Sequence, residues 1–151
     1  MACHLAIAGV TGAVGQEFLR ILEQREFPFD SLKMLASARS KGKKITFRNK
    51  EYTVEELTDN SFSDVDIALF SAGGSRSKQF ASAVVDAGAV MVDNSSAFRM
   101  DPEVPLVIPE INPEAIENHK GIIANPNCST IQMLVALDPI RRAAGIRRVV
   151  V

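Results

Sequence analysis

Short apolar runs alternate with helical patterns along this chain, and this alternation constrains the fold more than any other feature. Strand-like apolar runs cover residues 5–8, 32–36, 66–70, 89–92, 107–108 and 122–123. Apolar residues at helical spacing cover 14–22, 75–85 and 129–144. Buried parallel strands need crossover helices between them. The pattern therefore predicts an α/β fold, with a doubly wound, mostly parallel sheet that has helices on both of its faces.

Turn and capping residues predict where some of these segments begin and end. Ser75 is expected to cap the second helix, and residues 45–54 are expected to form a hairpin that turns at Asn49-Lys50. The pair Arg141-Arg142 falls near the end of the third helix, where cations are stabilised, and Gly145 is expected to end that helix.

Length, charge and cysteine content exclude several classes of protein. A chain of 151 residues is about one domain, and a formal net charge of -1 gives no general attraction to nucleic acid or to a membrane surface. No apolar run reaches the roughly 20 residues of a membrane span, and no targeting segment is recognisable. Cys3 and Cys128 lie far apart and form no CxxC pair, so we expect a reduced, cytoplasmic protein without a metal centre.

The carboxyl ends of the predicted strands carry glycine-rich or polar segments, and ligands of doubly wound sheets bind at these ends. The first segment, Gly9-x-x-Gly12-x-x-Gly15, allows a tight turn and the close approach of a pyrophosphate to a helix N-terminus. It contains the candidate cofactor-binding residues Gly9, Thr11, Gly12, Ala13, Val14 and Gly15. The alternative is a tight connection with no ligand. If the loop binds a dinucleotide, the doubly wound sheet is of the Rossmann-like type.

The end of the second strand favours NADP over NAD. An NAD domain usually has a carboxylate there for the ribose 2′-OH, whereas this chain has Ser37-Ala38-Arg39-Ser40. The guanidinium of Arg39 and the hydroxyls of Ser37 and Ser40 suit a 2′-phosphate. The alternative is a solvated basic turn that continues into Lys41. A third segment, Ser71-Ala72-Gly73, lets a nucleotide lie against the backbone, or equally begins a helix built for packing.

Two further candidates carry charge or a nucleophile. Arg99 lies in a polar loop with Asn94 and Ser96, which suits a phosphate or carboxylate ligand, the alternative being an ion pair with a nearby carboxylate at position 101 or 103. Cys128 lies where a strand gives way to a helix, and the partial positive charge of a helix start favours the nucleophilic thiolate. The alternative for Cys128 is simple burial, although Asn127 and its neighbours are polar.

Three motifs resemble those of the aspartate-β-semialdehyde dehydrogenase family, in order and spacing over essentially the whole chain. They are the glycine loop at 9–15, Asp93-Asn94-Ser95-Ser96-Ala97-Phe98-Arg99, and Asn125-Pro126-Asn127-Cys128-Ser129-Thr130. The related N-acetyl-γ-glutamyl-phosphate reductases usually have Pro-Gly-Cys around the cysteine, so Asn127 favours the aspartate family.

The resemblance implies an enzyme that reduces and dephosphorylates β-aspartyl phosphate with NADPH, releasing aspartate semialdehyde and inorganic phosphate, on the route to lysine, methionine and threonine. It implies that Cys128 forms a thioester, which Asn127 helps to orient, and that Arg99 binds the phosphoryl group. It further implies that the pyrophosphate is bound by Thr11, Gly12, Ala13 and Val14. The 2′-phosphate would be bound by Arg39 and Ser40.

Family members are longer than this chain. We therefore expect residues 1–146 to form the NADP-binding domain with its cysteine, and 147–151 to begin a second domain that supplies a base and further substrate contacts. The complete enzyme is expected to be a homodimer or higher oligomer. His4 and His119 do not match the family's base, so the chain alone is expected to be inactive. A non-catalytic nucleotide-binding module is the alternative.

Overall fold

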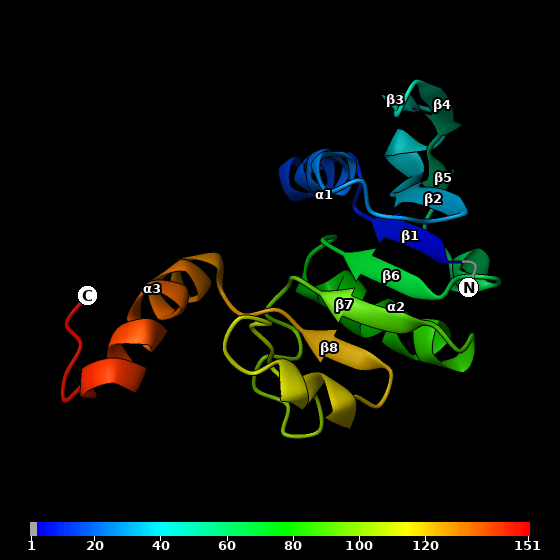
Figure 1. The fold of residues 1–151 in the computed structure, drawn as a ribbon. Coiled ribbons are helices and arrows are strands. Elements are labelled where there is room, and N and C mark those ends of the chain that lie inside the picture. Colours follow the sequence, from blue (N-terminus) through cyan, green and yellow to red (C-terminus); the bar gives the residue numbers. More distant parts are fainter. Residues whose placement is uncertain (1–2) are drawn as a thin grey trace.

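The structure is a computed structural model that describes residues 3–151, and its main body is a parallel sheet. Within these residues the sheet has six strands in the order β5-β2-β1-β6-β7-β8, and each runs parallel to its neighbours (Figure 1). The strands are β1 (His4–Ala8), β2 (Ser31–Ala36), β5 (Glu55–Glu56), β6 (Ile67–Phe70), β7 (Val90–Asp93) and β8 (Ile122–Ala124). The predicted α/β class and mostly parallel sheet are confirmed.

Helices cover both faces of the sheet, because alternate residues of each strand point to opposite sides. On one face, α1 (Ala13–Gln24) packs Leu19 and Leu22 in a cluster with Leu5 and Ile7 of β1. On the other face, α2 (Gly74–Asp86) packs against the intervening residues of the strands, in a cluster that includes Ala6, Ala8, Leu35, Phe70, Phe80 and Val84. The continuous apolar runs of the strands are thus explained by burial on both faces.

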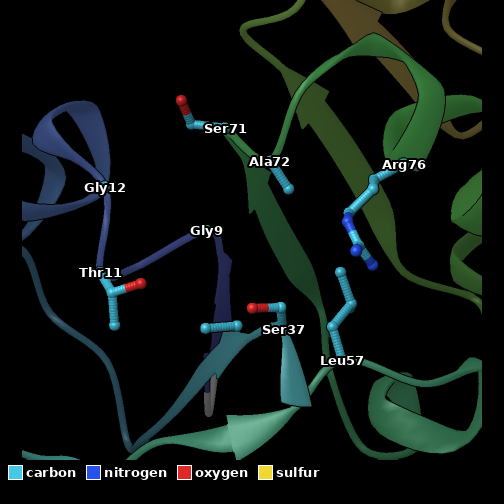
Figure 2. A pocket seen from close by; sticks show the side chains of 9 residues that line it. Gly9, Thr11, Gly12, Ser37, Leu57, Ser71, Ala72 and Arg76 are labelled. Atoms are coloured by element: carbon cyan, nitrogen blue, oxygen red, sulfur yellow. The ribbon is translucent and has the colours of Figure 1, made fainter. Parts of the chain in front are cut away.

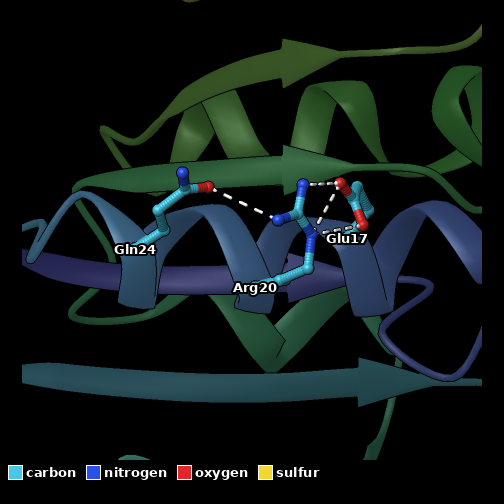
Figure 3. Close-up of polar contacts among 3 residues, drawn as sticks. All are labelled: Glu17, Arg20 and Gln24. Atoms are coloured by element: carbon cyan, nitrogen blue, oxygen red, sulfur yellow. Dashed lines mark hydrogen bonds and ion pairs between the residues drawn. The ribbon is translucent and has the colours of Figure 1, made fainter.

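The inner stripe of α1 is narrower than the sequence pattern indicates. Gly15, Leu19 and Leu22 are buried, whereas Val14 and Ile21 remain 40% and 38% exposed. On the outer side, Arg20 pairs with Glu17 at 2.5 Å and donates to Gln24 at 3.4 Å (Figure 3). Exposed pairs of this kind contribute little to stability, so the outer face of α1 is an ordinary solvated surface.

Three local predictions are wrong. The hairpin of β3 (Lys44–Phe47) and β4 (Lys50–Thr53) turns at Arg48-Asn49, one residue early, because both of these residues take the positive φ that a two-residue hairpin turn requires. Ser75 does not cap α2, since the helix already begins at Gly74. Residues 107–108 are buried but form no strand. A single bridge joins Leu106 to β8, because the flanking prolines lack backbone donors.

The rest of the chain consists of short connections and a third helix. The connections include the 3₁₀ turns η1 (Ala38–Ser40), η2 (Asp59–Phe62) and η3 (Pro113–Asn118). Helix α3 (Cys128–Ala144) follows β8 and extends away from the sheet (Figure 1). Within α3 one residue is buried, Asp138, which pairs with Arg141 and Arg142 at 2.7 and 2.6 Å. Gly145 ends α3 as predicted.

Candidate functional site

The loops that follow the strands are hydrogen-bonded to one another along one edge of the sheet. Gly9 N–H donates to the Leu35 carbonyl at 2.9 Å, and Ser71 N–H donates to the Ala8 carbonyl at 2.8 Å. Further along the edge, Asn94 N–H bonds to Phe70 at 2.9 Å and Asn125 N–H bonds to Asp93 at 2.8 Å. The segments that sequence reasoning selected are therefore brought together at the carboxyl edge of the sheet.

The glycine loop at 9–15 is compressed against its neighbours in a way that only glycine allows. Gly9 has a φ of +89°, and a Cβ atom placed on it would lie 2.3 Å from the Ser71 carbonyl oxygen. A Cβ atom on Gly15 would lie 2.3 Å from the Gly9 carbonyl oxygen. The side chain of Gln16 then fixes the loop by donating to the Val10 carbonyl at 2.8 Å. The first turn of α1, whose N–H groups have no partner within the helix, follows directly.

A pocket of ≈ 280 Å³ opens between the ends of β1, β2 and β6 (Figure 2). It is lined by Gly9, Thr11, Gly12, Ala36, Ser37, Leu57, Ser71, Ala72 and Arg76. The glycines leave the backbone open to close approach, and the rest of the lining provides hydroxyls and one guanidinium. These groups suit a dinucleotide with its phosphates. The lining therefore fits such a cofactor.

Six of the predicted cofactor residues line this pocket, and six do not. The six that do are Gly9, Thr11, Gly12, Ser37, Ser71 and Ala72. Ala13, Val14 and Gly15 lie in the first turn of α1, and Gly73 lies at the start of α2. In η1, Arg39 is exposed to solvent, while Ser40 is buried.

Sequence reasoning missed Ala36, Leu57 and Arg76 as lining residues. Leu57 reaches the pocket because its N–H bonds to the Ala36 carbonyl at 2.8 Å, a tertiary contact with no sequence signal. Arg76 had a usable signal, since it lies in the first turn of the helix that follows the glycine pair at 73–74.

Asp93, at the end of β7, holds the loop that contains Arg99. Its carboxylate is fully buried and accepts hydrogen bonds from Ser77 Oγ at 2.7 Å, Ser95 N–H at 3.0 Å and Ser95 Oγ at 2.6 Å. These three donors offset the cost of removing a carboxylate from water. Because Ser77 belongs to α2, the loop is fixed to the helix that also contributes to the pocket.

Arg99 joins this loop to the segment that leads to Cys128. Its Nε donates to the Asn125 carbonyl at 2.9 Å and its Nη2 to the Asn94 carbonyl at 3.0 Å. The Asn125 side-chain amide donates to Asn94 Oδ1 at 2.7 Å. Within residues 3–151 Arg99 forms no ion pair, so the alternative of a bridge to a carboxylate at 101 or 103 is wrong. Guanidinium donors remain for an anion, and the candidate residue Ser96 is exposed.

Cys128 is the first residue of α3 and is exposed to solvent, so the alternative of simple burial is wrong. Asn127 caps the helix, with its Oδ1 accepting the Ser129 N–H at 2.9 Å. The cap fixes the position from which the thiol projects, and the helix start favours negative charge beside it. Cys3 differs: burial above all, and then the carboxylates of Asp66 and Asp30, raise the pKa of its thiol.

Neither histidine lies at this edge of the sheet. His4 begins β1 and its Nδ1 hydrogen-bonds with Ser31 Oγ at 2.7 Å, whereas His119 accepts the Gly121 N–H at 3.0 Å before β8 begins. In the part of the chain that the structure describes, no group of three potential metal-ligating side chains was found. Across the same residues, no helix combines the length and apolar character needed to cross a bilayer.

Comparison with known proteins agrees with this geometry. Residues 4–119 match the family described as semialdehyde dehydrogenase, NAD binding domain. The chain belongs to this family. Aspartate-semialdehyde dehydrogenases of Aquifex aeolicus and Bacillus subtilis are 60% and 55% identical to it, over 100% and 98% of this chain. These matches cover 45% and 43% of the two relatives, so the chain spans about half the length of the curated relatives it matches.

Solved structures of the family have the same fold. Aspartate semialdehyde dehydrogenase II of Vibrio cholerae, complexed with ASA, has a TM-score of 0.93 at 53% identity, over 97% of this chain and 48% of that one. The enzyme of Candida albicans with NADP has a TM-score of 0.79 at 29% identity, over 96% and 48%. The family resemblance seen in the glycine, arginine and cysteine motifs is thus confirmed.

Proposed function

We propose that this chain is the NADP-binding, cysteine-bearing part of an aspartate-semialdehyde dehydrogenase. The whole enzyme would convert β-aspartyl phosphate to aspartate semialdehyde and inorganic phosphate with NADPH, in the biosynthesis of lysine, methionine and threonine. The observation that supports the proposal is the link made by Arg99, whose guanidinium donates to the Asn94 and Asn125 carbonyls and so lies beside the segment that leads to Cys128. The named activities of the relatives support it.

The nucleotide site follows from the glycine loop and the pocket. We assign the pyrophosphate to Thr11, Gly12, Ala13 and Val14, where the N–H groups of the first turn of α1 have no helical partner. Ser37, Arg39 and Ser40 would hold the 2′-phosphate, and Ser71, Ala72 and Gly73 would lie along the dinucleotide. The NADP named with the Candida albicans structure supports this choice. When bound, NADPH supplies the hydride that converts a thioester to an aldehyde.

Cys128 would act as the acyl acceptor. Its thiolate attacks the acyl carbon of β-aspartyl phosphate and forms an S–C bond. The bond between the acyl carbon and the bridging oxygen breaks, and its electron pair leaves with that oxygen on inorganic phosphate. Arg99, with Asn94 and Ser96 in the same loop, would bind the phosphoryl group as it leaves. Asn127 would orient the thioester from its position next to the thiol.

Turnover would need groups outside these residues, because the two histidines of the chain lie away from the site. We therefore propose that the 151-residue chain alone is inactive, that residues 147–151 begin a second domain, and that the complete enzyme is a homodimer or higher oligomer. A cytoplasmic location is also proposed, since Cys3 and Cys128 are both free thiols.

Calorimetric titration of the chain with NADP and NAD tests the cofactor assignment. We expect NADP to bind at least tenfold more tightly, because a charge-assisted hydrogen bond to the 2′-phosphate is worth about 1.5–3 kcal/mol. Arg39→Ala should reduce this preference. Lys43→Ala removes a charge from the neighbouring exposed turn and should leave it unchanged. Equal affinity for the two nucleotides in the wild type would refute the 2′-phosphate site.

A further inference from the structure

Arg76 is the one charged residue among those that line the pocket at the carboxyl edge, as far as residues 3–151 show. It belongs to the first turn of α2, whereas the predicted 2′-phosphate residues belong to the segment after β2. Figure 2 shows its guanidinium extending from α2 toward the Leu57 side chain, on the side of the pocket where Ser37 follows β2. The pocket thus receives its positive charge from a helix that sequence reasoning did not connect with the 2′ position.

The guanidinium of Arg76 has no partner within residues 3–151. It forms no side-chain hydrogen bond and no ion pair there, a property that it shares with the exposed Arg25, Arg39, Arg147 and Arg148, none of which lines the pocket. No carboxylate lines the pocket to neutralise it. A guanidinium directed into a cavity alongside hydroxyls is suited to a phosphate group, which it can bind through two parallel N–H donors.

The pocket has two ends, which differ chemically. One end is the glycine loop at 9–12, where the backbone approaches closely and the pyrophosphate is expected. The other end includes Ser37 and Leu57, beyond β2, which is where a doubly wound domain reads the ribose 2′ substituent. The guanidinium of Arg76 points to this second end (Figure 2).

We propose that Arg76 binds the 2′-phosphate of NADP from α2 and is a specificity-determining residue for NADP over NAD. The inference rests on the proposed function, since it requires a dinucleotide in this pocket. It assigns to Arg76 the direct contact from inside the pocket, with Arg39 acting from the turn η1 that follows Ser37 in the chain.

Calorimetry with NADP and NAD on Arg76→Gln tests the proposal. The variant should lose about tenfold or more in NADP affinity and change less than about twofold toward NAD, as expected for one charge-assisted contact to the 2′-phosphate. Lys78→Gln is the matched control, because Lys78 is an exposed cation on the same helix and lies outside the pocket. It should leave both affinities unchanged. Urea unfolding of Arg76→Gln should match the wild type, since an exposed, unpartnered side chain is removed.

Four results would overturn the assignment. An equal loss toward NADP and NAD in Arg76→Gln would mean that Arg76 contacts a part common to both, such as the adenine ring, on which guanidinium groups stack. An equal loss of NADP affinity in Lys78→Gln would mean that only the overall charge of the helix acts. If the wild type binds NADP tightly and Arg76→Gln binds it equally well, the role of Arg76 would be refuted while the proposed function would stand. A wild-type chain that binds neither nucleotide would refute the proposed function as well.

Discussion

Replacing Gly9 with alanine should destabilise the fold by two separable effects. The φ of +89° disfavours any side chain by about 1–2 kcal/mol. The new Cβ would also lie 2.3 Å from the Ser71 carbonyl oxygen, which belongs to backbone held by the bond from Ser71 N–H to Ala8. Since backbone cannot turn aside as a flexible side chain can, overpacking adds about 1–3 kcal/mol. We expect a total of about 2–5 kcal/mol, a large part of the roughly 5–15 kcal/mol of a typical domain.

Two further glycines separate these effects in urea unfolding followed by circular dichroism. Gly88→Ala has the φ cost alone, because Gly88 has a φ of +81° and a Cβ atom added there would have no neighbouring atom within 4 Å. Gly15→Ala has the steric cost alone, with its Cβ 2.3 Å from the Gly9 carbonyl oxygen and no positive φ. The free energy of unfolding should fall most in Gly9→Ala. Equal losses in Gly9→Ala and Gly88→Ala would refute the close approach at the glycine loop.

Three other predictions concern α3 and the two thiols. Iodoacetamide should modify the exposed Cys128 before Cys3, whose pKa is raised by burial and by nearby carboxylates, and peptide mapping that finds the reverse order would contradict this. The hydrogen bond from Arg141 lowers the pKa of Asp138. The ionised carboxylate therefore stabilises α3 fully at pH values above the ordinary carboxyl pKa, and this stabilisation is lost as pH falls through the lowered pKa. Helicity should therefore fall on strong acidification, and less so in Asp138→Asn. Light scattering should show self-association through the exposed apolar side chains of α3 and of 149–151, and a constant monomer mass at all concentrations would oppose it.

The sequence was sufficient for the features that depend on local pattern. Apolar runs located the main strands because these strands are buried on both faces, and the glycine spacing located the loop that approaches the backbone of Ser71. The third helix was predicted from residue 129 and begins one residue earlier, at Cys128, because the side chain of Asn127 caps it there.

Features that depend on tertiary contact could not be predicted in this way. The strand β5 exists through its pairing with β2, and its short polar segment has no strand pattern of its own. The buried Asp93 depends on Ser77, which is 16 residues away on α2. The position of Arg76 in the first turn of α2 is visible in the sequence, but its entry into the pocket depends on which way α2 faces, which is set by tertiary packing.

Acyl transfer to Cys128 tests the central claim most directly. The chain is mixed with β-aspartyl phosphate in the absence of NADPH, so that an acylated thiol is not reduced further. The chain is expected to be inactive in turnover, but this first half-reaction uses its own thiol and needs no hydride. We predict release of at most one equivalent of inorganic phosphate per chain, together with an aspartyl adduct that peptide mapping by mass spectrometry places on Cys128. Hydroxylamine should remove the adduct, which should be absent from Cys3 and from Cys128→Ser. Phosphate release that is no faster in the wild type than in Cys128→Ser, with no adduct on Cys128, would contradict its role as the acyl acceptor.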